Sequence, residues 1–233
     1  MWGLPQTLLV TALAQLVAAA SPAHANEESA AAFKVDLLVT AISDYRFRGV
    51  SYSNGKPAIQ PLLTISHKSG IYALVFASNI AEYGGSNVEV DAGLGYAKQI
   101  GKVTADVSVL RYIYPGGSNT NFFEVFSSLS FPVGPGNAKL GASYSPKQKN
   151  LRGQDNLYMG LSGTLPLAST PLTLNASIGL ENGAFGNNKV DWTIGVDAPV
   201  KGFMAGVKYM DTAHSMGIPR SGAKAVFSLS RAF

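Results

Sequence analysis

The stretch from Ser43 to Ser51 (Ser-Asp-Tyr-Arg-Phe-Arg-Gly-Val-Ser) gathers side chains that could sort charged solutes. Asp44, Arg46 and Arg48 alternate within it, and alternate residues of an extended chain point to one face. Carboxylates recur in the same alternating way at Glu89, Asp91, Glu124, Asp191 and Asp197. Opposed acidic and basic groups across a wet passage sort solutes by charge. The residues predicted to line such a constriction are Asp44, Arg46, Arg48, Glu89, Asp91 and Glu124.

Two interpretations of these inward charges stay open. In a plugged barrel they pair only to satisfy one another. In a water-filled pore they face an open lumen, which many small inward residues favour, such as Gly93, Ser143 and Ser177. The lysines expected to add positive charge to the interior are Lys139, Lys147, Lys208 and Lys224.

His67 and Ser69 are the pair with a spacing that could serve catalysis, as in lipid-hydrolysing barrels. A serine nucleophile needs a base, and that base needs a third group to orient it. Ser69 falls in a predicted turn, and no acid or Asn is clearly placed beside His67. We therefore predict no catalytic residue and no enzyme.

Metal and cofactor sites are not indicated either. The chain has no cysteine, and His214 lies in a predicted loop with no second His nearby. Gly93-Leu-Gly95 precedes no helix and is no dinucleotide fingerprint. We expect no bound metal and no cofactor.

Strands must position these residues, because apolar and polar residues alternate with a period of two along most of the chain. Val88, Val90 and Leu94 share one face, and Glu89 and Asp91 share the other. The predicted strands are 33–48, 57–68, 71–79, 87–98, 102–114, 121–131, 138–147, 156–167, 171–181, 188–199, 203–211 and 222–233. Short turns alternate with longer polar connections, as in outer-membrane barrels. This predicts an all-β, transmembrane, antiparallel up-and-down barrel of twelve strands. Ten strands, or a shifted register in 71–79 where both faces are apolar, remain alternatives.

Composition agrees with a barrel in a membrane. Charged residues make up 14% of the chain, against about 25% in soluble domains. After the N-terminus, no apolar run approaches the roughly 18 residues that a spanning helix needs. The net charge of +4 comes from scattered basic residues, so no nucleic-acid partner is expected.

The N-terminal segment predicts export. Leu8 to Ala20 is a short apolar core, followed by Pro22 and the small-residue site Ala23-His24-Ala25. We predict a signal peptide over 1–25, a flexible periplasmic lead-in over 26–32 and the barrel over 33–233.

Aromatic residues near the strand ends predict two girdles at the membrane interfaces. One set comprises Phe33, Tyr72, Tyr96, Phe131, Phe203 and Phe233. The other comprises Tyr45, Phe47, Tyr112, Tyr114, Phe122, Phe123, Tyr144, Trp192 and Tyr209. Phe233 ends an amphipathic strand, which resembles the signal read by the barrel-assembly machinery.

The first predicted hairpin resembles a known family. Ser43–Ser51, Gly55-Lys-Pro57, Ser66–Gly70, Ile71-Tyr-Ala73 and Ser78-Asn79 are similar to the signature of the TorF-type porins. These small Gram-negative outer-membrane barrels were formerly catalogued as conserved hypothetical proteins. Tyr52 departs from the polar residue expected there. The resemblance implies a small barrel with no catalytic residues.

Together these features predict an outer-membrane porin for passive diffusion of small polar or charged solutes. The alternatives are a non-conducting structural or adhesive barrel and, third, a lipid-modifying enzyme. Expected partners are outer-membrane lipids and lipopolysaccharide, the barrel-assembly machinery and small solutes.

Overall fold

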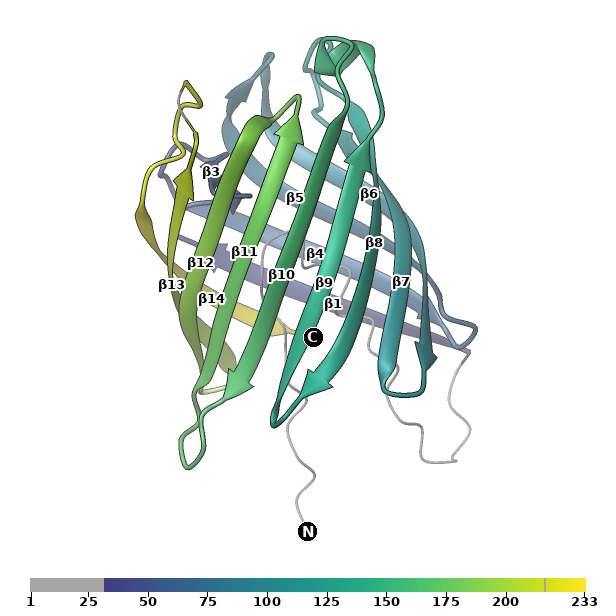
Figure 1. The fold of residues 1–233 in the computed structure, drawn as a ribbon, viewed down its shortest axis with the longest axis vertical. Coiled ribbons are helices and arrows are strands. Elements are labelled where there is room, and N and C mark those ends of the chain that lie inside the picture. The colour runs from purple at the N-terminus through teal and green to yellow at the C-terminus, as the bar shows by residue number, and fades with distance from the viewer. Residues whose placement is uncertain (1–31, 216) are drawn as a thin grey trace.

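A closed β-barrel is the fold of this chain in the computed structural model, which describes residues 32–215 and 217–233 (Figure 1). The predicted signal peptide (1–25) and residues 26–31 of the predicted lead-in lie outside the described residues. The barrel strands are β1 (Phe33–Ile42), β4 (Ala58–His67), β5 (Ile71–Tyr83), β6 (Ser86–Ile100), β7 (Val103–Ile113), β8 (Phe122–Val133), β9 (Gly136–Ser145), β10 (Asn156–Pro166), β11 (Thr173–Gly183), β12 (Gly186–Val200), β13 (Phe203–Ala213) and β14 (Lys224–Ala232). Two short strands, β2 (Arg46–Phe47) and β3 (Val50–Ser51), and a 3-10 turn, η2 (Lys149–Leu151), complete the described elements. Among these residues no helix is long and apolar enough to cross a membrane.

Pairing between the first and last strands closes the ring. Each barrel strand runs antiparallel to its neighbours, and β1 pairs with both β4 and β14. Thr40 lies opposite Ser230 in this seam. A closed ring leaves no strand edge, so every strand finds backbone partners within the barrel. The predicted twelve-strand antiparallel barrel is confirmed.

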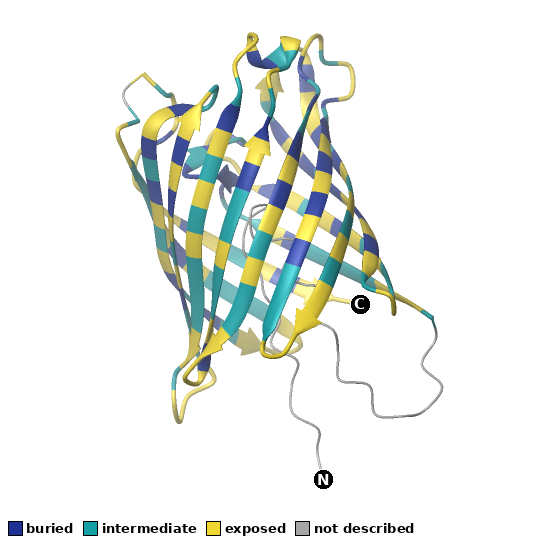
Figure 2. Ribbon diagram, turned by 45° about the vertical axis from the view of Figure 1, so that its right-hand side comes forward, coloured by how far each residue is buried: buried dark blue, intermediate teal, exposed yellow. Residues whose placement is uncertain are grey.

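Side chains alternate between the two faces of the wall, as the alternating bands of Figure 2 show. On β6, Leu94 is 57% exposed on the outside, whereas Glu89 is fully buried inside. The register of β5 is also settled, because Tyr72, Leu74 and Phe76 are buried while Ile71 and Val75 are exposed. The outer face is therefore largely apolar, and the inner face carries the charges.

The first predicted strand is too long. It was expected to run from 33 to 48, but β1 ends at Ile42 and the chain then turns away from the wall. Residues 43–57 fold inward around the β2–β3 ladder, with Arg46 opposite Ser51. Arg48 and Gly49 form its turn with φ values of 49° and 80°, as in the two-residue turns that suit twisted hairpins.

The predicted girdles are partly wrong. Tyr72, Tyr112 and Phe122 lie buried inside the barrel, as do Tyr45, Phe47 and Tyr114. Phe47 of the inward-folded segment packs against Tyr112, whose ring stacks on Phe122 at 4.4 Å, whereas Tyr72 hydrogen-bonds to Asp106. Aromatic side chains that do face outward near the strand ends include Phe33, Tyr96, Phe203, Tyr144, Trp192, Tyr209 and Phe233. Where both faces of a strand are apolar, the sequence alone does not distinguish an aromatic side chain that points into the barrel from one that points outward.

Candidate functional site

A hairpin formed by residues 43–57, here called the lumen hairpin, crosses the inside of the barrel (Figure 1). Its two arms are joined by the bond from the Tyr52 backbone N–H to the Tyr45 carbonyl, at 2.7 Å. The Ala81 backbone N–H donates to the Tyr52 carbonyl at 2.7 Å, which fixes the hairpin to β5. The segment, which leaves β1 and returns to β4, is therefore held on one side by β5.

Gly49 brings the tip of the hairpin against β13 and β12, two and three strands from β1 around the ring. A Cβ atom at this position would lie 2.2 Å from Thr212 Cγ2 on β13 and 3.0 Å from Asp191 Cβ on β12. Together with its φ of 80°, this contact favours glycine as long as Thr212 keeps its Cγ2 methyl group. The tip of the hairpin is thus fixed on the part of the wall formed by β12 and β13.

Arg48, beside Gly49, is the centre of the charged contacts. Its guanidinium donates to Glu124 on β8 and to Glu181 on β11, each at 2.9 Å. It also donates to the Ser143 hydroxyl on β9 at 2.5 Å and lies 4.3 Å from the centre of the Tyr158 ring on β10. One arginine therefore joins four strands.

A second cation completes this network. Lys189 Nζ on β12 lies 2.6 Å from Glu181 and donates to the Arg48 carbonyl at 2.6 Å. Burial alone would lower the pKa of Arg48, but the carboxylates of Glu124 and Glu181 raise it above its usual value. The guanidinium in the lumen hairpin is therefore charged, with a carboxylate on each side.

Arg46 fixes the hairpin from inside. Its Nε donates to Asp44 at 2.8 Å, and one terminal nitrogen donates to the carbonyls of Gly49 at 3.0 Å and Gly222 at 2.7 Å. Asp44 also accepts from the Ser51 hydroxyl at 2.5 Å. These bonds satisfy buried charges locally and tie the hairpin to the β13–β14 loop.

Glu89 and Asp91 lie behind the hairpin on β6. Glu89 accepts hydrogen bonds from the Tyr45 and Tyr114 hydroxyls at 2.5 and 2.8 Å. Asp91 is fully buried, and neither of its carboxylate oxygens has a hydrogen-bond partner among the described residues.

All six candidate residues point into the barrel, but they lie on two different kinds of element. Asp44, Arg46 and Arg48 do so from the hairpin, whereas they were expected on a strand. Glu89, Asp91 and Glu124 do so from the wall, as expected. Lys147 was wrongly placed inside, because it is exposed in the loop that follows β9. Lys224 is exposed at the start of β14, on the face of the strand that buries Val226 and Ser230.

Glu181 and Lys189 were missed as members of the site. They are cross-strand partners on β11 and β12. The sequence contained a signal for this pair, since an acidic and a basic residue lie on either side of the predicted 182–187 turn and opposite charges stabilise cross-strand pairs.

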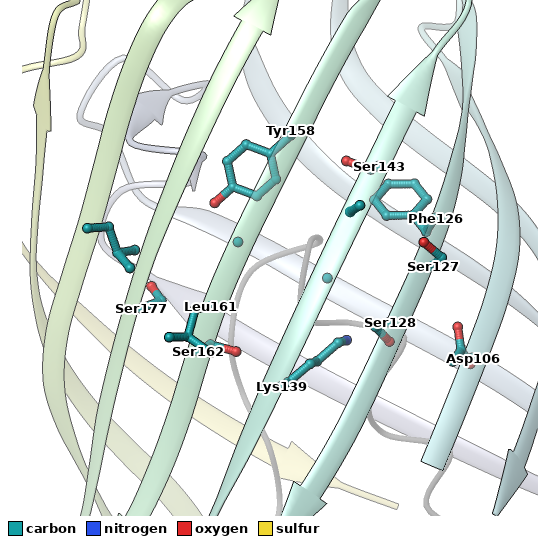
Figure 3. A pocket seen from close by; sticks show the side chains of 14 residues that line it. Asp106, Phe126, Ser127, Ser128, Lys139, Ser143, Tyr158, Leu161, Ser162 and Ser177 are labelled. Atoms are coloured by element: carbon teal, nitrogen blue, oxygen red, sulfur yellow. The ribbon is translucent and has the colours of Figure 1, made fainter. Parts of the chain in front are cut away.

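A cavity lies beneath the hairpin, between β7 and β11 (Figure 3). Tyr158, Ser143 and Phe126 border it, and the first two contact Arg48. Lys139, Asp106 and serine hydroxyls provide its polar groups. The lumen is thus occupied at the level of the hairpin and hollowed below it.

The His67–Ser69 pair lies at the turn between β4 and β5. His67 Nδ1 and the Ser69 hydroxyl are 2.8 Å apart, and the imidazole packs 4.8 Å from the Phe33 ring. In the part of the chain that the structure describes, no carboxylate or amide side chain hydrogen-bonds to His67, and no three potential ligands gather into a metal site.

The sequence from residue 26 to residue 231 matches a family model described as "Bacterial protein of unknown function (Gcw_chp)". The chain belongs to this family. No curated protein matches the sequence. The Gcw_chp barrel is similar in fold to a structure titled "KdgM porin", with a TM-score of 0.56 at 8% identity. It is equally similar to a NanC porin structure, with a TM-score of 0.56 at 14% identity. Each similarity covers 85% of this chain and 98% of the other.

Proposed function

We propose that this Gcw_chp protein is an outer-membrane porin through which small polar or charged solutes diffuse passively, with no reaction catalysed. The observation that carries the proposal is a closed twelve-strand barrel with an apolar outer face and a charged, partly hollow interior. Such a wall suits lipid outside and water inside. The fold shared with two proteins named as porins supports it, as does the resemblance of residues 43–79 to TorF-type porins.

The lumen hairpin would narrow this pore. Asp44, Arg46, Arg48, Glu89, Asp91 and Glu124 would form or border the constriction, joined by Glu181 and Lys189. Fixed opposite charges at the narrowest level would select solutes by charge and size.

The proposed location is the outer membrane of a Gram-negative bacterium. Phe227 and Leu229 face outward on β14, and the exposed Phe233 directly follows this strand, which supports recognition of Phe233 by the barrel-assembly machinery. Acyl chains of outer-membrane lipids and lipopolysaccharide would cover the apolar outer face.

Planar-bilayer recording of the purified protein tests the proposal. We expect discrete unitary current steps that are small, because the hairpin occupies the outer lumen. Heat-denatured protein in the same detergent is the control. Protein that inserts as a folded barrel but gives no unitary steps would contradict the porin function.

A non-conducting structural or surface-binding barrel is the second candidate. The complete burial of Glu124 and the near-complete burial of Arg48 favour it, since ion pairs in a plug serve to satisfy buried charge. Under this alternative, neither the native barrel nor a variant that lacks the hairpin pairs would pass current.

A further inference from the structure

The cavity beneath the lumen hairpin is lined by one basic and one acidic side chain, Lys139 and Asp106, that are not in direct contact. Lys139 extends from β9 toward Ser128, while Asp106 lies beyond it on β7 (Figure 3). No ion pair joins them among the described residues. Arg46, Arg48 and Lys189, by contrast, each contact a carboxylate directly.

Asp106 is held in place by a neutral group. The Tyr72 hydroxyl on β5 lies 3.1 and 3.0 Å from the two carboxylate oxygens. Tyr72 is itself buried, so a neutral hydroxyl fixes Asp106, and no cation forms a direct ion pair with it among the described residues. A rigid carboxylate in a partly enclosed cavity can attract a cationic group of a solute.

Lys139 offers the complementary group. It is partly buried on a lumen-facing position of β9, and neither an ion pair nor a hydrogen bond involves its ammonium in the described part of the chain. Ser128 lies between the two charges, and Ser162 and Ser177 add hydroxyls to the same cavity. These hydroxyls can donate to or accept from a small polar solute.

We infer that this cavity binds small zwitterions, with their carboxylate toward Lys139 and their ammonium toward Asp106. A monoanion would pair with Lys139 but would be repelled by Asp106. A monocation would pair with Asp106 but would be repelled by Lys139. A solute that carries both charges satisfies both side chains at once. This inference deepens the proposed function and rests on it, since the ligand reaches the cavity through the lumen.

Four solutes of nearly equal size test the charge preference. L-serine is zwitterionic, glycerate is anionic, serinamide is cationic and glyceramide is neutral at neutral pH. Saturation-transfer NMR on the detergent-solubilised full barrel measures their binding without requiring conduction. We expect L-serine to bind about fivefold more tightly than each of the others, in line with one additional partly exposed ion pair.

Two variants change the preference in opposite directions. Lys139→Gln removes the cation and should shift the preference to serinamide. Asp106→Asn removes the anion and should shift it to glycerate. Lys34→Gln is the matched control, because Lys34 pairs with Asp36 at 2.7 Å in an exposed position away from the cavity.

Equal binding of the four solutes, or unchanged L-serine binding in Lys139→Gln, would overturn the inference. Bilayer recording separates this result from the proposed function. A barrel that binds L-serine without conducting would contradict the porin function alone. A conducting barrel without preference for L-serine would contradict the zwitterion site alone.

Discussion

At the scale of single residues, Arg48 determines how the lumen hairpin is held. It contacts Glu124 and Glu181 at 2.9 Å and stacks on Tyr158. Arginine suits this position because its planar fork can donate to several acceptors at once. Lysine would keep the charge but could not reach all of these partners in the same geometry.

Replacement of Arg48 should destabilise the folded protein. Arg48→Ala leaves two buried carboxylates with less positive charge around them, and loss of one partner of a buried ion pair costs about 3–5 kcal/mol. Urea unfolding in micelles, followed by Trp192 fluorescence, measures this loss. Arg48→Lys should fall between the alanine variant and the native protein.

Arg111→Ala is the matched control, because Arg111 is exposed on the outer face of β7. We expect its free energy of unfolding to change by about 0.5 kcal/mol or less. If Arg48→Ala unfolds at the same urea concentration as Arg111→Ala, the Arg48 network does not hold the hairpin.

Two glycines of the hairpin provide a second test at this scale. Gly49 and Gly55 have similar φ values of 80° and 72°, but a Cβ at Gly49 would meet Thr212, whereas nothing lies within 4 Å of one at Gly55. Both alanine variants bear the backbone strain, and only Gly49→Ala adds a clash. Gly49→Ala should therefore lose about 1–3 kcal/mol more stability than Gly55→Ala.

The same unfolding measurement compares the two glycine variants. Equal stabilities would show that the hairpin tip does not rest against β13 in the folded protein.

At the scale of elements, the strands could be predicted from sequence but the hairpin could not. Alternation defined β6, β12 and β14 to within about two residues because one face of each strand is apolar. The same alternation continues through Asp44, Arg46 and Arg48, so nothing local marks the end of β1 at Ile42. Only the contacts with distant strands explain why the chain leaves the wall there.

The lumen hairpin should be dispensable for the barrel. Ile42 and Ala58 are register partners on β1 and β4, and such partners lie about 5 Å apart. A short Gly-Ser linker in place of residues 44–55 can therefore join the strands. We expect a folded barrel with a larger unitary conductance in planar bilayers.

Shortening of the β10–β11 turn over 168–171 is the control, since these residues are exposed and the change leaves the lumen hairpin in place. Its conductance should match that of the native protein. A hairpin-less barrel with native conductance would show that residues 43–57 do not limit the passage.

At the scale of the whole molecule, the lumen hairpin links distant parts of the barrel. Through Arg48 and Gly49 it contacts strands from β8 to β13, at sequence separations of 76 to Glu124 and 133 to Glu181. The inward direction of these residues follows from alternation. Which of them meet depends on strand tilt and stagger around the ring, so the network could not be predicted from the sequence.

The position of the hairpin tip is tested most directly by a disulfide between Gly49→Cys and Thr212→Cys. The chain has no other cysteine, and a Cβ at Gly49 would lie 3.6 Å from Thr212 Cβ, within the range for a disulfide. We expect the double variant to form an intramolecular crosslink on oxidation, detected by mass spectrometry of peptides without reduction. Free thiols after oxidation, in a barrel that is otherwise folded, would contradict a hairpin that folds into the lumen with its tip against β13.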